Sequence, residues 1–221
     1  MQRIILLLTF VVSLLIFAGA RDSFSTNISN DPPRLSSKEL KRADHLAYSS
    51  SIDSNDPGGF YRGGNASRPI DSVGGSDTGL YLWLDPNNAE LYDDKYLGTG
   101  LYVVNKRNEA VSFDAQDSRL YLIAEVFYNN SWQAIEYMPS SWCGNSYHHI
   151  PLESQHLWKF IVPIYDGKHE VQMRYRLTVS SDRLGNKDTL YSNSIPIKFN
   201  KQQLKEKKKY NPNGLMDPYD D

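Results

Sequence analysis

The segment Glu170-Val-Gln-Met-Arg-Tyr-Arg-Leu-Thr-Val-Ser180 decides the fold. Its apolar side chains occupy every second position from Val171 to Val179, and polar side chains occupy the positions between them. Successive side chains of an extended strand point to opposite faces, so this period of two predicts a strand with one buried face and one solvated face. Such strands are typical of antiparallel sheets.

Segments of the same kind recur on both sides of this strand. Residues 119–128 carry apolar side chains at both sets of alternate positions, so we expect a strand that is covered on both faces. Asn129-Asn130 then predicts a two-residue hairpin turn into residues 131–136. The other expected strands are 80–84, 90–97, 101–104, 110–113, 157–162 and 190–199, with Pro196 marking an edge strand. Asp, Asn, Gly and Pro predict turns at 85–88, 105–108, 114–118 and 165–168.

This arrangement favours an all-β fold. Short strands are separated by turns every eight to twelve residues, and no amphipathic helix lies between them. We expect an antiparallel, immunoglobulin-like β-sandwich of about 7–9 strands over residues 80–200. A jelly roll or a small barrel is the alternative. The chain lacks the Cys-Trp-Cys pattern of antibody domains, so "immunoglobulin-like" describes architecture alone.

Residues 1–20 are typical of a signal peptide. A short positive start, Met1-Gln-Arg3, precedes the apolar run Ile4–Phe17 and the small residues Ala18-Gly-Ala20. The run is shorter than the ~20 residues that span a bilayer. We therefore expect cleavage after Ala20, although an uncleaved anchor is the alternative. The mature protein is expected to be secreted or periplasmic, without stable membrane insertion.

The two flanks of the sandwich have a different composition. Residues 21–79 form a Ser/Gly/Asn-rich leader that we expect to be largely disordered. One short helix is possible at residues 36–48, where Ser36 and Glu39 have the spacing of a capping box. Residues 201–221 form a charged tail, expected to be solvated.

Charge argues against one class of protein, the nucleic-acid binders, and cysteine content excludes another, the domains stabilised by internal disulfides. Removal of Arg3 with the signal peptide leaves 23 of the 24 Lys and Arg residues against 26 Asp and Glu, which argues against a nucleic-acid binder. The single cysteine, Cys143, excludes an intramolecular disulfide. Stability is therefore expected to come from a buried core.

The stretch Ile135–Ile150 contains that cysteine. Three roles for the stretch are considered: a catalytic site, a metal site and an ordered loop. Cys143-Gly-Asn-Ser-Tyr147 matches the papain-like pattern poorly, and only 78 residues follow where a base is needed some 130 residues downstream. A metal site would use Cys143 with His148 or His149, but adjacent histidines in a strand point to opposite sides. We expect residues 139–151 to form an ordered loop between strands instead, without metal or cofactor.

In that loop we expect Trp142 and Cys143 to tuck into the end of the sandwich while Tyr147 and the histidines face outward. The candidate binding residues are Trp142, Asn145, Tyr147, His148 and His149.

Several short segments of the sequence resemble those of a group of uncharacterised exported proteins of Bacteroidota-type bacteria. They are Ile135-Glu-Tyr137, Ser141-Trp-Cys-Gly-Asn-Ser-Tyr147, Trp158-Lys-Phe160, Pro163-Ile-Tyr-Asp-Gly167 and Tyr191-Ser-Asn193. The resemblance covers about residues 80–203. It implies a secreted or periplasmic β-sandwich and brings no known activity or catalytic residues.

The expected function is a non-catalytic binding or interaction module of the cell envelope, with a protein or a glycan as partner. Its 15 Tyr, 8 Phe and 4 Trp are available for recognition. Two alternatives remain open. One is a structural envelope component that assembles through an edge strand or a tail; the other is an enzyme that uses Cys143 with a nearby histidine. The sequence does not fix an oligomeric state.

Overall fold

A computed structural model describes residues 31–36, 65–71, 73–76, 78–136, 138, 146–179 and 188–204. These residues form strands and one 3-10 helix, η2 (Lys201–Leu204), with no α-helix among them. The predicted all-β class is therefore confirmed. The proposed signal peptide, residues 37–48 of the possible helix and the tail beyond residue 204 lie outside the described residues. No helix within the described ranges is long and apolar enough to cross a membrane.

The first sheet has the strand order β2-β10-β4-β3 and is antiparallel throughout. Its members are β2 (Arg68–Pro69), β3 (Leu80–Tyr92), β4 (Tyr96–Asn105) and β10 (His156–Pro163). Asp93 and Asp94, with φ of 54° and 52°, make the turn between β3 and β4. The expectation of one strand over residues 90–97 is wrong, because these left-handed aspartates reverse the chain there.

The expected turn at residues 85–88 is also wrong, since β3 continues through it. The register of β3 against β4 shifts between Leu84 and Ala89, so the extra residues form a bulge. The Thr99 hydroxyl of β4 donates to the carbonyl of Asp85, and the Asp85 carboxylate accepts from the Asn87 N–H at 3.0 Å. The first bond ties the bulge to β4, and the second lies within the bulge.

The second sheet has the order β13-β12-β7-β8, and β14 also pairs with β12. Its members are β7 (Leu122–Tyr128), β8 (Ser131–Ala134), β12 (His169–Thr178), β13 (Thr189–Tyr191) and β14 (Ile195–Phe199). The predicted Asn129-Asn130 hairpin turn is confirmed, with φ of 51° and 62° at the two asparagines. The alternation predicted for β12 is confirmed too, because Met173, Tyr175 and Leu177 are buried.

Two smaller groups of strands complete the fold. One contains β5 (Val111–Gln116), β6 (Arg119–Leu120) and β9 (Tyr147–Leu152); the other pairs β1 (Leu35–Ser36) with β11 (Tyr165–Asp166) in parallel. The expected turn at 114–118 narrows to Asp117 and Ser118, with φ of 49° and 62°, because residues 114–116 pair with β9.

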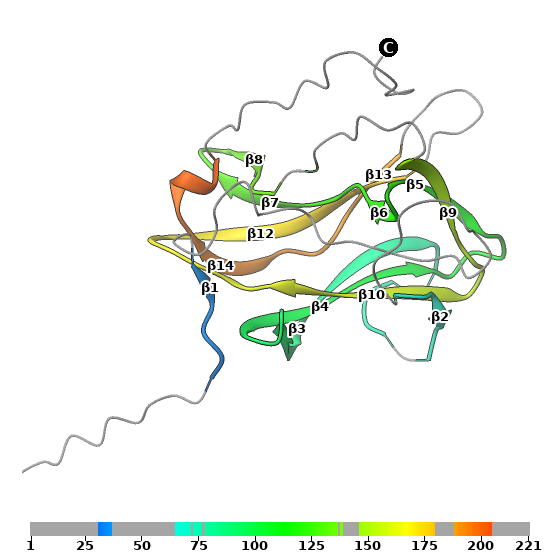
Figure 1. Cartoon of the computed structure of the whole chain (residues 1–221), viewed down its shortest axis with the longest axis horizontal. Coiled ribbons are helices and arrows are strands. Elements are labelled where there is room, and N and C mark those ends of the chain that lie inside the picture. The colour runs from blue at the N-terminus through cyan, green and yellow to red at the C-terminus, as the bar shows by residue number, and fades with distance from the viewer. Residues whose placement is uncertain are drawn as a thin grey trace, which may run out of the picture. The chain divides into compact units, whose positions relative to one another are not determined.

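The expected tight turn at residues 165–168 is wrong for a different reason. This segment carries the chain from β10 in the first sheet to β12 in the second (Figure 1), so it does not join neighbouring strands of a hairpin. Gly167 is required there, since a Cβ atom would lie 2.2 Å from the backbone carbon of Phe199.

The inward side chains of both sheets belong to one continuous core, which makes the fold a sandwich. Its largest fully buried side chains include Trp158, Phe113, Tyr165 and Tyr175. Phe113 of β5 meets Trp158 of β10 edge to face at 5.4 Å between ring centroids. The immunoglobulin-like arrangement of the strands stays a prediction.

Parts of the expected leader belong to this sandwich. Leu35 is buried in the core, its N–H donates to the carbonyl of Ile164 at 3.0 Å, and the Leu97 N–H donates to the carbonyl of Pro33 at 2.8 Å. Residues 70–71 and 73–76, which we call the strap, lie against the outer face of the first sheet. There Ile70 and Val73 pack on a second small cluster of Tyr102, Val104 and Leu157.

Candidate functional site

Three of the five predicted binding residues lie on β9, so the loop expected over residues 139–151 is wrong from Tyr147 onward. Tyr147, His148 and His149 pair with Gln116, Ala115 and Asp114 of β5, respectively. Trp142 and Asn145, together with Cys143, lie outside the described residues. The binding role of all five stays a prediction.

The two histidines have separate surroundings. Nδ1 of His148 lies 3.1 Å from the carbonyl oxygen of Ser146, and Nε2 lies 3.4 Å from Oγ of Ser118. Nδ1 of His149 lies 3.1 Å from Oδ1 of Asp114. Because they are consecutive residues of a strand, they point to opposite sides. Within the described part of the chain, no group of three or more His, Cys, Asp or Glu side chains could hold a metal ion.

The candidate site that sequence reasoning missed is the outer face of the second sheet. Side chains next to the buried residues of β7 and β12 must point outward, and antiparallel pairing aligns them across strands. Glu125 lies opposite Arg174, Phe127 opposite Trp132, and Arg176 opposite Tyr191. We call these six residues the outer patch.

A cation–π stack crosses three strands of the outer patch. Cζ of Arg174 lies 4.1 Å from the ring centroid of Trp132 on β8 and 3.9 Å from that of Tyr191 on β13. Trp132 also meets Phe127 edge to face at 5.4 Å. A guanidinium between two rings gains from both ring quadrupoles, so the stack holds Trp132 and Tyr191 in place.

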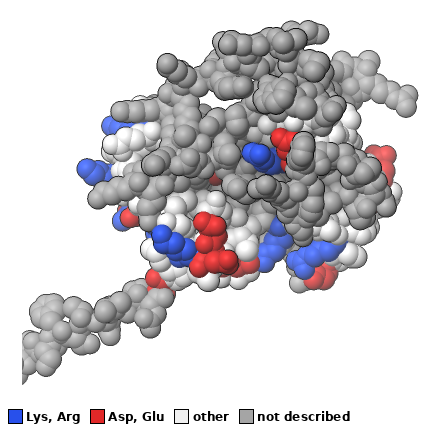
Figure 2. All heavy atoms as spheres, viewed as in Figure 1, with Lys and Arg blue, Asp and Glu red and all other residues white. Residues whose placement is uncertain are grey.

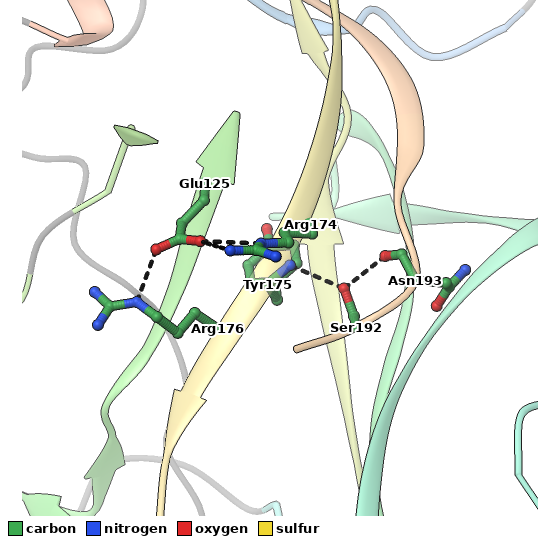
Figure 3. Close-up of polar contacts among 6 residues, drawn as sticks. All are labelled: Glu125, Arg174, Tyr175, Arg176, Ser192 and Asn193. Carbon is green, nitrogen blue, oxygen red and sulfur yellow. Dashed lines mark hydrogen bonds and ion pairs between the residues drawn. The ribbon is translucent and has the colours of Figure 1, made fainter. Parts of the chain in front are cut away.

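Glu125 holds both arginines of the outer patch. Its Oε2 accepts hydrogen bonds from Nε and Nη2 of Arg174 at 3.1 and 3.0 Å, and its Oε1 forms an ion pair with Nε of Arg176 at 2.8 Å. One carboxylate faces two guanidiniums, so the trio carries a formal charge of +1. In Figure 3 the terminal nitrogens of Arg176 point away from Glu125.

Exposure distinguishes the members of the outer patch. The side chains of Glu125 and Arg174 are 10% and 19% exposed, whereas that of Arg176 is 38% exposed. Phe127 and Tyr191 are 43% and 48% exposed, two of the four exposed large hydrophobic residues in the described ranges. Arg174 is therefore an internal brace, while Arg176, Phe127 and Tyr191 remain available to a ligand.

The two residues after Tyr191, Ser192 and Asn193, form hydrogen bonds that connect this part of the chain to both sheets. The Ser192 hydroxyl accepts from the Tyr175 N–H at 2.9 Å and donates to the Asn193 carbonyl at 2.7 Å (Figure 3). The Asn193 side chain accepts from the Leu84 N–H at 2.8 Å and donates to the Leu84 carbonyl at 2.9 Å. Asn193 thus joins the two sheets next to the β3 bulge.

The first sheet also has aromatic side chains on its outer face, but they are used in packing. The rings of Trp83 and Tyr102 lie 5.7 Å apart, and the strap covers Trp83 so closely that a Cβ atom on Gly74 would lie 2.3 Å from its ring. Lys159 forms an ion pair with Glu90 beside them at 2.7 Å. These aromatics stabilise the fold and leave the outer patch as the more accessible aromatic surface.

Charged side chains of both signs are interspersed over the described part of the face drawn in Figure 2. Pairs such as Lys198 with Glu170, 3.8 Å apart and well exposed, contribute little to stability. The outer patch differs from such pairs because its central ions are mostly buried and flanked by rings.

One carboxylate lies inside the core. Glu136 accepts hydrogen bonds at Oε1 from the Tyr165 hydroxyl at 2.7 Å and the Tyr175 hydroxyl at 3.5 Å, and at Oε2 from the Ala124 N–H at 3.0 Å. Burial raises the pKa of Glu136 to about 7, and the three hydrogen bonds offset part of this effect. Burial also raises the pKa of both tyrosines well above the usual value.

Comparisons with protein-family models, curated proteins and solved structures gave no match. Function must therefore be argued from the geometry of the site.

Proposed function

We propose that the protein is an exported, non-catalytic binding module of the cell envelope, and that the outer patch is its binding surface. The observation that carries the proposal is the Trp132–Arg174–Tyr191 stack, held by Glu125 on a sheet face. Trp, Tyr and Arg are enriched among the residues that dominate binding energy at interfaces. A rigid stack of these residue types is therefore suited to recognition.

Ordinary cross-strand packing explains part of this arrangement. Aromatic and charged pairs stabilise sheets by a few tenths of a kcal/mol to about 1 kcal/mol each, which accounts for Trp132 and Arg174. It accounts for only part of Phe127 and Tyr191, which contact Trp132 and Arg174 but keep almost half of each side chain exposed. Their exposure supports a role in binding beyond a role in folding.

Export is supported by the signal-peptide pattern of residues 1–20. Sequencing the N-terminus of the mature protein tests this part. We expect a mature chain that begins at Arg21, recovered from the secreted or periplasmic fraction. Recovery of an intact N-terminus in the cytoplasm would contradict export.

Binding is tested with the full mature chain on a glycan array and on immobilised envelope proteins. The double variant Phe127→Ala/Tyr191→Ala removes the two exposed rings of the outer patch. Ile161→Ala is the matched control, because Ile161 is a similarly exposed hydrophobic residue, 40% exposed, on the first sheet.

We expect the wild type and Ile161→Ala to retain the same ligands and the double variant to lose them. Equal retention by all three proteins would remove the outer patch from the proposal. Absence of any ligand for the wild type on both arrays would contradict the binding function itself. Thermal unfolding of each variant checks that the sandwich is intact.

A further inference from the structure

We propose that Arg176 and Tyr191 form a subsite for an acidic sugar, a pyranose that carries a carboxylate group. This inference rests on the proposed binding function and names its ligand class. The two residues lie directly opposite each other on β12 and β13. Both are more exposed than the ion pair beside them.

Arg176 supplies the recognition of the carboxylate. Glu125 engages its Nε, while Nη1 and Nη2 form the side of the guanidinium that points away from that carboxylate (Figure 3). Two parallel N–H donors match the two oxygens of a carboxylate, and such forked, charge-assisted pairs are among the strongest hydrogen bonds in proteins. Nε of Arg176 lies 2.8 Å from Oε1 of Glu125 as an ion pair without hydrogen-bond geometry, so the attraction to Glu125 keeps the guanidinium at this place on the patch before a ligand binds.

Tyr191 supplies the surface for the sugar ring. The C–H groups on one face of a pyranose carry partial positive charge, and an aromatic face carries partial negative charge, so the two stack. Arg174 contacts the Tyr191 ring at 3.9 Å and fixes it, while 48% of the residue stays exposed. Tyr191 lies on one side of β12, and the Arg176 guanidinium reaches toward Glu125 on the other side, so an oligomer of acidic sugars contacts the two side chains with neighbouring rings.

The charge of the outer patch favours an anionic ligand over a neutral sugar. Arg174 and Arg176 together carry two positive charges against one on Glu125, so a ligand carboxylate completes the neutralisation. A neutral sugar would stack on Tyr191 and leave the fork of Arg176 solvated.

The distribution of apolar area favours a sugar over a protein. The two exposed rings, Phe127 and Tyr191, are separated by Glu125 and Arg174, which pair across the strands between them. The cores of protein interfaces are enriched in arginine but depleted of acidic residues such as Glu125. Here ions occupy the middle of the patch, an arrangement that suits the mixed polar and apolar surface of a carbohydrate.

The test titrates three probes into the full mature protein by calorimetry. The probes are an oligogalacturonate, a neutral galactose oligomer of the same length and a glutamate decapeptide. We expect the oligogalacturonate to bind at least about tenfold more tightly than the neutral oligomer, because the added contact is a charge-assisted hydrogen bond. Added salt should weaken this binding.

Two variants localise the contact. Arg176→Lys retains the charge but removes the fork, so we expect about a tenfold loss of affinity for oligogalacturonate and little change for the neutral oligomer. Tyr191→Ala should weaken both sugars, and Ile161→Ala should weaken neither. Equal affinity for acidic and neutral sugars, or an Arg176→Lys variant that binds like the wild type, would overturn the acidic subsite.

The outcomes separate this inference from the proposed function. Binding of the peptide without the oligogalacturonate would overturn the sugar class while the binding function stands. A wild-type protein that binds none of the three probes but retains other array ligands through Phe127 and Tyr191 would overturn the ligand class alone. No ligand on any array would contradict the binding function itself.

Discussion

The Tyr165 hydroxyl lies 2.7 Å from Oε1 of Glu136, inside the core shared by the two sheets. Tyr165 belongs to β11 and Glu136 follows β8, so the bond joins two segments that are not neighbours in any sheet. The same carboxylate also accepts from the backbone of Ala124 on β7. A single ionisable group therefore ties three parts of the sandwich together.

The protonation of Glu136 makes stability depend on pH. Its pKa rises from 4.5 to about 7 on folding, so the folded state binds the proton more tightly than the unfolded state. This contribution is complete below pH 4.5 and is lost as pH rises through about 7. We expect the free energy of unfolding to fall by on the order of 3 kcal/mol from this group across that window.

Urea unfolding of the wild type and of Glu136→Gln between pH 4.5 and pH 8 measures this effect. The glutamine keeps one of the two acceptor oxygens and does not titrate, so the difference between the two proteins should grow in favour of the variant as pH rises. Glu153→Gln, at an exposed position, is the control and should follow the wild type. A difference that is constant with pH would show that Glu136 does not titrate in this range.

Loss of the Tyr165 hydroxyl should destabilise the protein more than loss of the Tyr175 hydroxyl. Tyr165→Phe removes a donor at 2.7 Å from a buried carboxylate, which we expect to lower the free energy of unfolding by about 1–3 kcal/mol. Tyr175→Phe removes a donor at 3.5 Å and should have a smaller effect. Urea midpoints at pH 7 compare the two, and equal losses would contradict the assigned geometry.

Leu35 should behave as a core residue although it lies far from the main strands in sequence. Leu35→Ala removes a side chain that is 5% exposed, so we expect a loss of about 2–4 kcal/mol from the cavity and the lost burial. Leu91→Ala, at a site that is 48% exposed, should change stability by less than about 0.5 kcal/mol. Similar melting temperatures for both variants would place residues 31–36 outside the folded core.

Asn193 should couple the outer patch to the first sheet. Asn193→Ala removes two hydrogen bonds to the Leu84 backbone, at 2.8 and 2.9 Å, and should lower the free energy of unfolding by about 1–3 kcal/mol. Asn193→Asp keeps the acceptor and loses the donor, so its loss should be smaller at acidic pH, where the aspartate can be protonated. Tyrosine near-ultraviolet dichroism reports whether Tyr191 shifts; an unchanged spectrum and stability would refute the coupling.

Local pattern predicted much of the fold. The period of two that defines β12 and the Asn129-Asn130 turn depend on nearby residues alone, and the structure confirms both. The single strand expected over residues 119–128 is instead divided at Tyr121 into β6 and β7, and Phe127 on its outer face is 43% exposed. Turn-forming residues give a wrong prediction where contacts with distant strands determine the local conformation. Asp85-Pro-Asn-Asn88 has turn residues but is kept in β3 by a bond from Thr99, and the Asp166-Gly167 pair joins two sheets.

The outer patch was not predicted because it depends on register. Trp132, Arg174 and Tyr191 come from three strands, and alternation along each strand predicts only that polar or aromatic side chains face outward. Which strands are neighbours, and which residues are opposite, is fixed by pairings such as Arg174 with Glu125. The sequence signal that was present is the Arg-x-Arg spacing in β12, which puts two guanidiniums on one face.

The parallel pairing of Leu35 with Tyr165 has a consequence for how the chain is made. The N-terminal segment emerges from the ribosome first. At a synthesis rate of about 5–20 residues per second, the partner strand follows roughly ten seconds later. During that interval Leu35 has no place in a core, because β11 and the neighbouring β10 do not yet exist. The nascent chain therefore leaves this apolar side chain exposed until residues 156–166 have been synthesised.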